Sequence, residues 1–508
     1  MLRRALFAFL FVSLLVAPAD ATWSIVVVNR RTGEVAVGAA TCIARINLAM
    51  GLPTLVPGVG AGVVQASGNR LDLVPMTQGL KAGLAPSAIL ALVRAVEPSP
   101  GQLQTGIVSL YRGAPVTFTG GAVGRGKAGV VGEVGDLAYA IQGNVLTGGG
   151  VVLAAEAALL AAPGDVGQKL LAAMQAARNL GGDGRCSCEL GDPTGCGVPP
   201  RDFDKSAHVG FLLVTRVGDE LPPCRIGSDC ADGFFYLRLN VRGTDATEND
   251  PDPVDQLTQR YAAWRAQRID HPDGVLSTVD SVASLPADGL TRRVVTVQLA
   301  DLEGNPLTHG GNKVQVTSAE NARLHLALGP VADLGDGRYR FTIGATRLVG
   351  TDRLAIRAED RLVKATLFPY LEVRSEPPAA LHVGIDRLSA SSGGTAPFVL
   401  SQPEFANGAY VLLASASGTS PGTPFGRAGE LPLVLDPVLV TSLRLAGAPA
   451  FFPGTRGALD SSGRAEAAFV APPGALTSLI GRRLSWAAVL ATGAKAATTE
   501  AVGFEVVP

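Results

Sequence analysis

The order of apolar segments over residues 22–215 most constrains what this chain can fold into. Apolar segments bounded by turn residues are typical of strands, and segments with three- to four-residue spacing are typical of helices. The order is strands, helices, strands, helices and a last strand, which predicts an α+β domain with two sheets between helical layers. The predicted strands cover residues 22–28, 34–40, 60–65, 104–111, 116–119, 137–142 and 208–215, and the predicted helices cover residues 75–82, 86–96 and 151–179, the last broken near Pro163-Gly164.

The first 21 residues contain the three parts of an export signal. Arg3 and Arg4 supply positive charge, residues 5–16 form an apolar run too short to span a bilayer, and Ala19 and Ala21 offer small residues to a signal peptidase. The twin arginine also fits the Tat route, but the rest of that signal is missing, so the general secretory route is favoured. We expect a protein that is secreted, periplasmic or at the cell surface, with a processed chain that begins at Thr22.

Length and charge exclude several classes of protein. The 508 residues suffice for about three domains. A net charge of −1, without a dense run of Lys and Arg, argues against nucleic acid as a partner. The 62 Gly and 34 Pro, with only 17% charged residues, favour short strands joined by turns. No segment after the signal is long and apolar enough to predict a membrane span.

All six cysteines precede residue 231. An even number of cysteines in an exported chain predicts up to three disulfides, and the sequence leaves their pairing open. A zinc site is the alternative, but the spacing matches no common ligand pattern and the compartment favours oxidation. We therefore expect no metal, no cofactor, and a disulfide-rich insertion over residues 183–230. The candidate disulfide residues are Cys42, Cys186, Cys188, Cys196, Cys224 and Cys230.

Four short segments, taken in order, resemble the domain of unknown function 1028 family. They are Thr22-Trp-Ser-Ile-Val, Gln142-Gly-Asn-Val-Leu, Gly181-Gly-Asp-Gly-Arg and Ser206-Ala at the entry to the last strand. The resemblance covers roughly residues 22–240 and implies a four-layer αββα fold of the N-terminal-nucleophile hydrolase clan, whose usual chemistry is amide-bond hydrolysis. It implies no particular substrate.

Two positions depart from the family pattern. Gln65-Ala-Ser-Gly-Asn69 continues into Arg70-Leu71, where family members carry an Asn-Pro and an aromatic-Gly step. Thr41-Cys42 stands where a Ser-Arg type of pair is expected. Both departures fall near the site that the resemblance implies, so they favour a changed substrate preference or a loss of activity.

Signal cleavage after Ala21 would place a hydroxyl and a free amine on Thr22. In N-terminal-nucleophile enzymes the hydroxyl attacks a carbonyl while the amine of the same residue takes the proton. An α-amine with an ordinary pKa of about 8 suits base catalysis near neutral pH. The alternative is that Thr22 is a β-branched residue that begins an edge strand.

Further candidates accompany Thr22. Asn144 offers an amide donor to a developing oxyanion, Asp183 could orient the Thr22 amine, and Lys205 could lower the pKa of the nucleophile. The structural alternatives are turn residues for Asn144 and Asp183 and a solvated surface lysine for Lys205. The candidates for substrate binding are Gln65, Asn69 and Gln142.

Other catalytic arrangements are weaker. His208 is the only histidine of the first domain and lies in an apolar strand, so a Ser-His-Asp triad would depend on it alone. Gly418-Thr-Ser-Pro-Gly matches the nucleophile-elbow pattern, but the proline and the lack of a following helical pattern predict a loop. The acidic run over residues 245–255 could bind calcium, but a linker in which Asp252 and Pro253 start a helix over residues 254–267 is the better interpretation.

The pattern changes near residue 287 to alternating strands separated by turns. Residues 286–375 resemble the bacterial immunoglobulin-like β-sandwich modules of adhesins and other surface proteins. A second all-β domain is predicted over residues 380–508. The predicted order is therefore a signal peptide (1–21), a hydrolase-like domain (22–242), an acidic linker with a short helix (243–285) and these two β modules.

This organisation supports two functions. The first is an exported amidohydrolase or peptidase that uses Thr22 as its nucleophile on a small amide or peptide substrate. The second is a catalytically inactive secreted or cell-surface binding and adhesion protein, which uses the same fold as a scaffold and binds a surface component through its β modules. Only the first requires a free, reactive Thr22.

Overall fold

The computed structural model describes residues 22–189, 195–199, 201–220, 234–243, 250–282, 284–320, 322–376, 379–493 and 495–508. The predicted signal peptide, Cys224 and Cys230 lie outside the described residues. The chain divides into two compact units. The first runs to Leu276 and includes Asp301–Asn305 and Val363–Pro369, and the second contains the other residues after Leu276.

Two antiparallel sheets form the centre of the first unit. The larger sheet has the strand order β10-β9-β2-β1-β8-β7 and the smaller sheet the order β3-β4-β5-β6. The larger sheet contains β1 (Thr22–Asn29), β2 (Glu34–Thr41), β7 (Ala128–Val134), β8 (Leu137–Asn144), β9 (Val209–Thr215) and β10 (Leu237–Val241), and the smaller sheet contains β3 (Pro53–Val56), β4 (Gly60–Ala66), β5 (Leu103–Ser109) and β6 (Val116–Thr119).

Every residue of β1 is buried because the larger sheet is covered on both faces. Successive side chains of a strand point to opposite faces, and here each face contacts a different core. Ile25 and Val27 pack with the helices, whereas Val26 and Val28 pack toward the smaller sheet. This double burial explains why β1 is a nearly continuous apolar run in the sequence.

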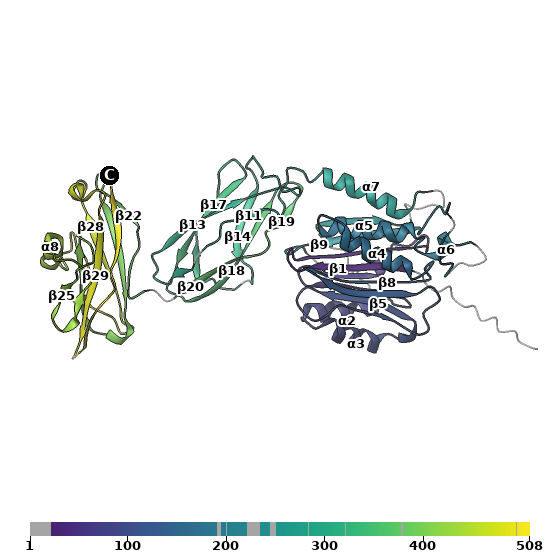
Figure 1. Cartoon of the computed structure of the whole chain (residues 1–508), viewed down its shortest axis with the longest axis horizontal. Helices are drawn as coiled ribbons and strands as arrows, with labels where there is room; N and C mark the ends of the chain where they lie inside the picture. Colours follow the sequence, from purple (N-terminus) through teal and green to yellow (C-terminus); the bar gives the residue numbers. More distant parts are fainter. Residues whose placement is uncertain are drawn as a thin grey trace, which may run out of the picture. The chain divides into compact units, whose positions relative to one another are not determined.

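Helices cover both sheets of the first unit. Figure 1 shows α4 and α5 on one side of the strands and α2 and α3 on the other. The helix α7 packs on α5, β9 and β10. The helices are α1 (Leu48–Gly51), α2 (Arg70–Lys81), α3 (Pro86–Val96), α4 (Gly150–Ala161), α5 (Val166–Asn179), α6 (Gly184–Ser187) and α7 (Pro253–Ala266).

The sequence predicts most of these elements, but it misses the strands β3, β7 and β10, the short helices α1 and α6, and the true start of α2. The helix predicted from residue 75 begins at Arg70, because Asn69 and Asp72 form a capping box at its N-terminus. The break predicted near Pro163 separates α4 from α5. α7 begins where Asp252 and Pro253 predict a helix, and its Val254 and Leu257 belong to the core of the first unit.

The second unit consists of two β modules. The first has a sheet β11-β13-β17-β15, with β16 on β17, and a sheet β12-β20-β18-β14. Its strands are β11 (Thr278–Val279), β12 (Leu285–Pro286), β13 (Arg292–Gln298), β14 (Lys313–Ser318), β15 (Leu326–Leu328), β16 (Ala332–Asp333), β17 (Arg338–Ala345), β18 (Gly350–Glu359) and β20 (Leu371–Glu376), whereas the short strand β19 (Lys364–Thr366) falls in the part of the chain that belongs to the first unit.

The second module has a three-stranded sheet β21-β23-β28 and a larger sheet β22-β31-β29-β24-β27, with β30 on β29. Phe398 and Trp486 meet in its core with ring centroids 4.7 Å apart. It adds a hairpin and the helix α8 (Pro437–Leu445), which the sequence analysis does not predict. The strands are β21 (Leu381–Val383), β22 (Arg387–Ser389), β23 (Gly394–Ser401), β24 (Ala409–Ser415), β25 (Thr423–Pro424), β26 (Glu430–Leu431), β27 (Arg456–Ala458), β28 (Arg464–Ala471), β29 (Arg483–Thr492), β30 (Lys495–Thr498) and β31 (Val502–Val507).

Candidate functional site: a cleft beside Thr22

Thr22 begins β1 and lines a cleft of about 450 Å³. Its partner in the sheet is Asn144, the last residue of β8. The rest of the cleft comes from the loop after β2 together with α1, from the end of β4, and from the start of α2. The fold therefore brings Thr22 together with the predicted substrate-binding residue Gln65, which lines the same cleft.

A network of buried amide side chains lies behind Thr22. Nε2 of Gln65 donates to the main-chain carbonyl of Thr22 at 3.0 Å and to Oε1 of Gln104 at 2.7 Å. Oγ of Ser24 donates to Oε1 of Gln65 at 2.7 Å. Nδ2 of Asn144 donates to the same Gln104 oxygen at 2.9 Å. The network joins the two sheets and fixes the backbone at Thr22.

Gln142 and Gln104 complete this network. Nε2 of Gln142 donates to Oγ of Ser24 at 2.7 Å, and Nε2 of Gln104 donates to the carbonyl of Gly143 at 3.0 Å. The family resemblance points to neither Ser24 nor Gln104, although a polar side chain within an apolar strand is a signal that can be recognised in the sequence. Amides and hydroxyls do not titrate near neutral pH, so these groups fix geometry and supply no base.

Asn144 is fully buried, and its amide has two different ends. Its Nδ2 donates to Gln104, whereas its Oδ1 has no hydrogen-bond partner among the described residues. The Nδ2 group that would donate to an oxyanion therefore already donates one hydrogen bond to Gln104. The oxyanion role of Asn144 stays a prediction.

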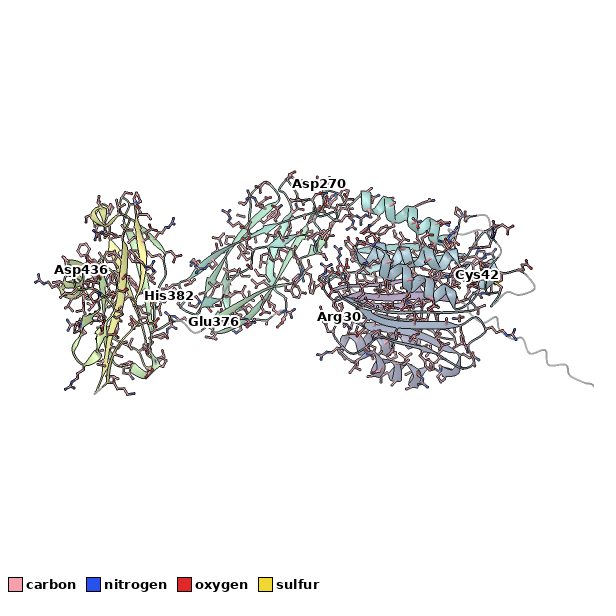
Figure 2. All side chains as sticks on the ribbon, in the orientation of Figure 1. Arg30, Cys42, Asp270, Glu376, His382 and Asp436 are labelled. Atoms are coloured by element: carbon pink, nitrogen blue, oxygen red, sulfur yellow. A yellow bond between two sulfur atoms is a disulfide. The ribbon has the colours of Figure 1, made fainter. Side chains whose placement is uncertain are left out.

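Asp183 is fully buried at the N-terminus of α6. Its Oδ2 accepts a hydrogen bond from the main-chain N–H of Cys42 at 2.7 Å and forms an ion pair with Arg185 at 2.9 Å. Cys42, marked in Figure 2, forms a disulfide with Cys186 of α6. These contacts hold the loop after β2 against α6, and that loop forms one wall of the cleft. The role predicted for Asp183, orienting the Thr22 amine, is not tested by them.

Lys205 and Asn69 lie in environments that the sequence does not reveal. Lys205 is only 8% exposed, so the solvated-lysine alternative is wrong. Asn69 caps α2: its Oδ1 accepts from the N–H of Leu71 at 2.8 Å, and its Nδ2 donates to Glu97 at 3.3 Å. Burial and the nearby Glu97 carboxyl raise the pKa of Asp72 to about 7, although the hydrogen bond from the Asn69 N–H lowers it.

The cysteines of the described chain form disulfides. Cys42 pairs with Cys186, and Cys188 pairs with Cys196. Among the described residues, the one cluster of potential metal ligands is Cys42, Cys186 and His208, whose ligand atoms lie within 4.8 Å of one another. The two sulfur atoms are bonded to each other, so neither is a thiolate ligand. The expectation that the protein binds no metal stays a prediction.

Three residues with left-handed backbone conformations flank the segments around the cleft. Ala66 has φ +63° and follows Gln65, Val145 has φ +54° and follows Asn144, and Arg45 has φ +62° in the loop after β2. The carbonyl of Arg125 accepts from the N–H of Val145 at 3.0 Å. Such conformations cost about 1–3 kcal/mol outside glycine and gather at functional sites.

The fold defines an α+β domain with a cleft at the start of its central strand, followed by β-rich modules. Residues 22–189 match the family of unknown function DUF1028, and residues 274–364 match invasin domain 3. The N-terminal region is therefore of the DUF1028 family, and a module of the invasin domain 3 type follows it. Both resemblances stated from the sequence are confirmed.

Several solved structures are similar to parts of this chain, at low sequence identity. Protein SPO2555 from Silicibacter pomeroyi is 19% identical, covers 49% of this chain and 95% of its own, and has a TM-score of 0.35. Adhesin InvE from Yersinia pseudotuberculosis is 17% identical, covers 45% of this chain and 58% of its own, and has a TM-score of 0.19. Domains 5-6 of the S-layer protein SbsC are 14% identical over 45% of this chain and 95% of their own, with a TM-score of 0.20. No curated protein sequence matches the chain.

The disulfides and the invasin-type module are features of extracytoplasmic proteins. In the part of the chain that the structure describes, none of the helices has the length and apolar character needed to cross a membrane.

Proposed function

We infer that the protein is a cell-surface binding protein, exported by its N-terminal signal. In this proposal the DUF1028 domain presents the cleft beside Thr22, and the β modules carry that domain and contact a surface component. The observation that carries it is the match of residues 274–364 to invasin domain 3.

The chemistry of the cleft supports binding. The side chains that fix Thr22 are amides and a hydroxyl, which offer hydrogen bonds but do not exchange protons near neutral pH. The nearby buried carboxylate of Asp183 is occupied by the N–H of Cys42 and the guanidinium of Arg185. A ligand in the cleft would thus meet Thr22 and Gln65 in fixed positions, and a fixed placement of the contacting groups is what a binding site requires.

A second candidate function is amide hydrolysis by Thr22. One observation favours it: among the described residues that line the cleft, Thr22 is the only one with a hydroxyl group. The presence of helices on both sides of the two sheets (Figure 1) also supports this candidate, because the sequence resemblance implies the αββα fold of the N-terminal-nucleophile clan. Cleavage after Ala21 would expose the amine of Thr22. In this second proposal Asn144, Asp183 and Lys205 keep the roles predicted from the sequence.

One labelling experiment separates the two functions. The processed full-length protein is incubated with β-lactone and peptidyl-epoxyketone probes, and the mass of its N-terminal peptide is measured. An adduct on an N-terminal Thr22, absent in Thr22→Ala and retained in Thr22→Ser, supports the hydrolase. An unmodified N-terminal Thr22 supports the binding protein.

Surface exposure tests the first proposal directly. Intact and lysed producing cells are treated with trypsin, and the full chain is followed by immunoblot. We expect the β modules to be cut on intact cells. Protection until the envelope is broken would place the protein in the periplasm and contradict a cell-surface role.

A further inference from the structure

We propose that the cleft beside Thr22 binds a peptide chain end or an N-acyl amino acid that carries a free carboxylate and an aliphatic last side chain. This inference names the ligand class of the cleft, so it rests on the proposed binding function. It depends on the residues of the cleft wall and not on the reactivity of Thr22.

Arg70 is the only charged residue among the described residues that line the cleft. It is half-buried at the start of α2, and no hydrogen bond or ion pair to it is found in the described structure. Other partly buried arginines of this unit are paired: Arg178 contacts Asp255 at 2.6 Å, and Arg216 contacts Glu34 at 2.8 Å. A partly desolvated guanidinium without a partner favours an anion, and its planar fork fits a carboxylate with two parallel hydrogen bonds.

Asn47 supplies a second polar group to the cleft. Its Oδ1 accepts a hydrogen bond from Nδ2 of Asn240 at 2.7 Å. This contact orients the amide and leaves the NH₂ group of Asn47 available as a donor. Arg70 and Asn47 are therefore both donors, and a carboxylate can accept from both.

The remaining wall selects an aliphatic group. Its side chains are aliphatic or thioether groups with no aromatic ring among them: Ile43, Ile46, Leu48, Met50, Leu52 and Val64. A leucine-sized side chain gains from leaving water against such a wall, whereas a charged side chain would be desolvated without a partner. The volume of about 450 Å³ lies within the range of small-molecule sites.

The orientation of the ligand follows from these positions. Gln65 and Thr22 lie at the end of β4 and the start of β1, and their carbonyl and amide groups are already paired with each other. The free donors are Arg70 and Asn47, so the carboxylate is expected beside these two residues. The aliphatic side chain is then expected against the wall formed by α1 and the loop before it.

Calorimetric titration of the full-length processed protein tests the proposal. The probes are N-acetyl-Gly-Leu and its C-terminal amide, and both are titrated in the Thr22→Ala background so that no turnover occurs. We expect the acid to bind at least about tenfold tighter than the amide, since a hydrogen bond to a charged carboxylate is stronger than one to a neutral amide. N-acetyl-Gly-Lys should bind at least about tenfold weaker than N-acetyl-Gly-Leu.

Arg70→Gln should abolish the preference for the acid, while Arg112→Gln, at an exposed arginine outside the cleft lining, should retain it. Calorimetric melting checks that both variants fold, and if Arg70→Gln does not, Arg70→Lys should still reduce the preference. Equal affinity for acid and amide, or a preference that survives in Arg70→Gln, overturns the proposal. These results are independent of the Thr22 labelling and the surface-exposure assay, so failure here is distinguishable from failure of the proposed function.

Discussion

Gln65 holds Thr22 in place across the interface between the two sheets. Nε2 of Gln65, on β4 of the smaller sheet, donates to the main-chain carbonyl of Thr22, on β1 of the larger sheet, at 3.0 Å. The same amide binds Ser24 and Gln104, and all four residues are buried. The cleft wall at Thr22 is thus fixed by a side chain that is distant in the sequence.

Replacing Gln65 with Met should destabilise the first unit by about 2–4 kcal/mol, because three buried polar groups each lose one hydrogen bond. Hydrogen exchange measured by mass spectrometry on peptides from β1 and β4 reports this loss within the full chain. Gln78→Met, at an exposed position of α2, is the matched control and should change stability by less than about 0.5 kcal/mol. Equal effects of the two substitutions would show that the network does not stabilise the sheet interface.

Asp72 should make the first unit less stable as the pH rises. Burial, with Glu97 nearby, raises the pKa of Asp72 from its ordinary value to about 7 in the folded chain. Its stabilising contribution is therefore fully present below the unfolded pKa of about 4, and it is lost as the pH rises through 7. Asp72→Asn keeps an acceptor for the Asn69 N–H and removes the titration.

We expect Asp72→Asn to raise the stability of the first unit by about 2 kcal/mol at pH 8 and by much less at pH 5. Differential scanning calorimetry at the two pH values measures this as a shift in Tm of about 4–8 °C at pH 8. Asp136→Asn, at an exposed carboxylate, should give no such difference. A gain that is independent of pH would exclude Asp72 as the titrating group.

The two disulfides should contribute unequally to stability. Cys42–Cys186 joins residues separated by 144 positions, whereas Cys188–Cys196 spans a separation of 8. A cross-link that closes a longer loop restricts the unfolded chain more, giving upper estimates of about 5 and about 2.5 kcal/mol for the two. Paired Cys→Ser substitutions, compared by pulse proteolysis in urea, should show the larger loss for Cys42 and Cys186. Equal losses would contradict the entropic account.

The sequence predicts the elements whose signals are local. Asp252 before Pro253 identifies the start of α7, because the carboxylate accepts from the N–H of Val254 at 2.8 Å as a helix cap does. β7 was missed because its glycines weaken the strand pattern. A Cβ at Gly132 would come within 2.1 Å of the Tyr139 hydroxyl on the neighbouring strand, so a larger residue there would require the Tyr139 side chain to shift.

The candidate site is predicted only in part, because its contacts are not local. Thr22 and Gln65 could be selected from the sequence through the family resemblance, and the fold does place both at one cleft. Gln104 gains its role only when the two sheets pack together. In the sequence Arg70 is only a departure from the family pattern, and the structure shows that it lines the cleft. No spacing in the sequence encodes either relationship.

Arg216 should be the most costly arginine of the first unit to remove. Its side chain is 10% exposed and pairs with Glu34 at 2.8 Å and with Asp273 at 2.5 Å. The guanidinium also lies 3.5 Å from the centroid of the Tyr236 ring. Burial opposes its charge, but Tyr236, Glu34 and Asp273 raise the pKa of Arg216 well above its usual value.

Arg216→Met should destabilise the first unit by about 3–5 kcal/mol at pH 8, because it leaves two buried carboxylates without their cation. Adding Glu34→Gln to Arg216→Met removes one of these unpaired charges, so the double variant should recover part of the stability measured by urea unfolding. Arg31→Met, at an exposed ion pair, is the control and should cost less than about 1 kcal/mol. A loss that is unchanged by Glu34→Gln would mean that Arg216 acts through packing and not through charge.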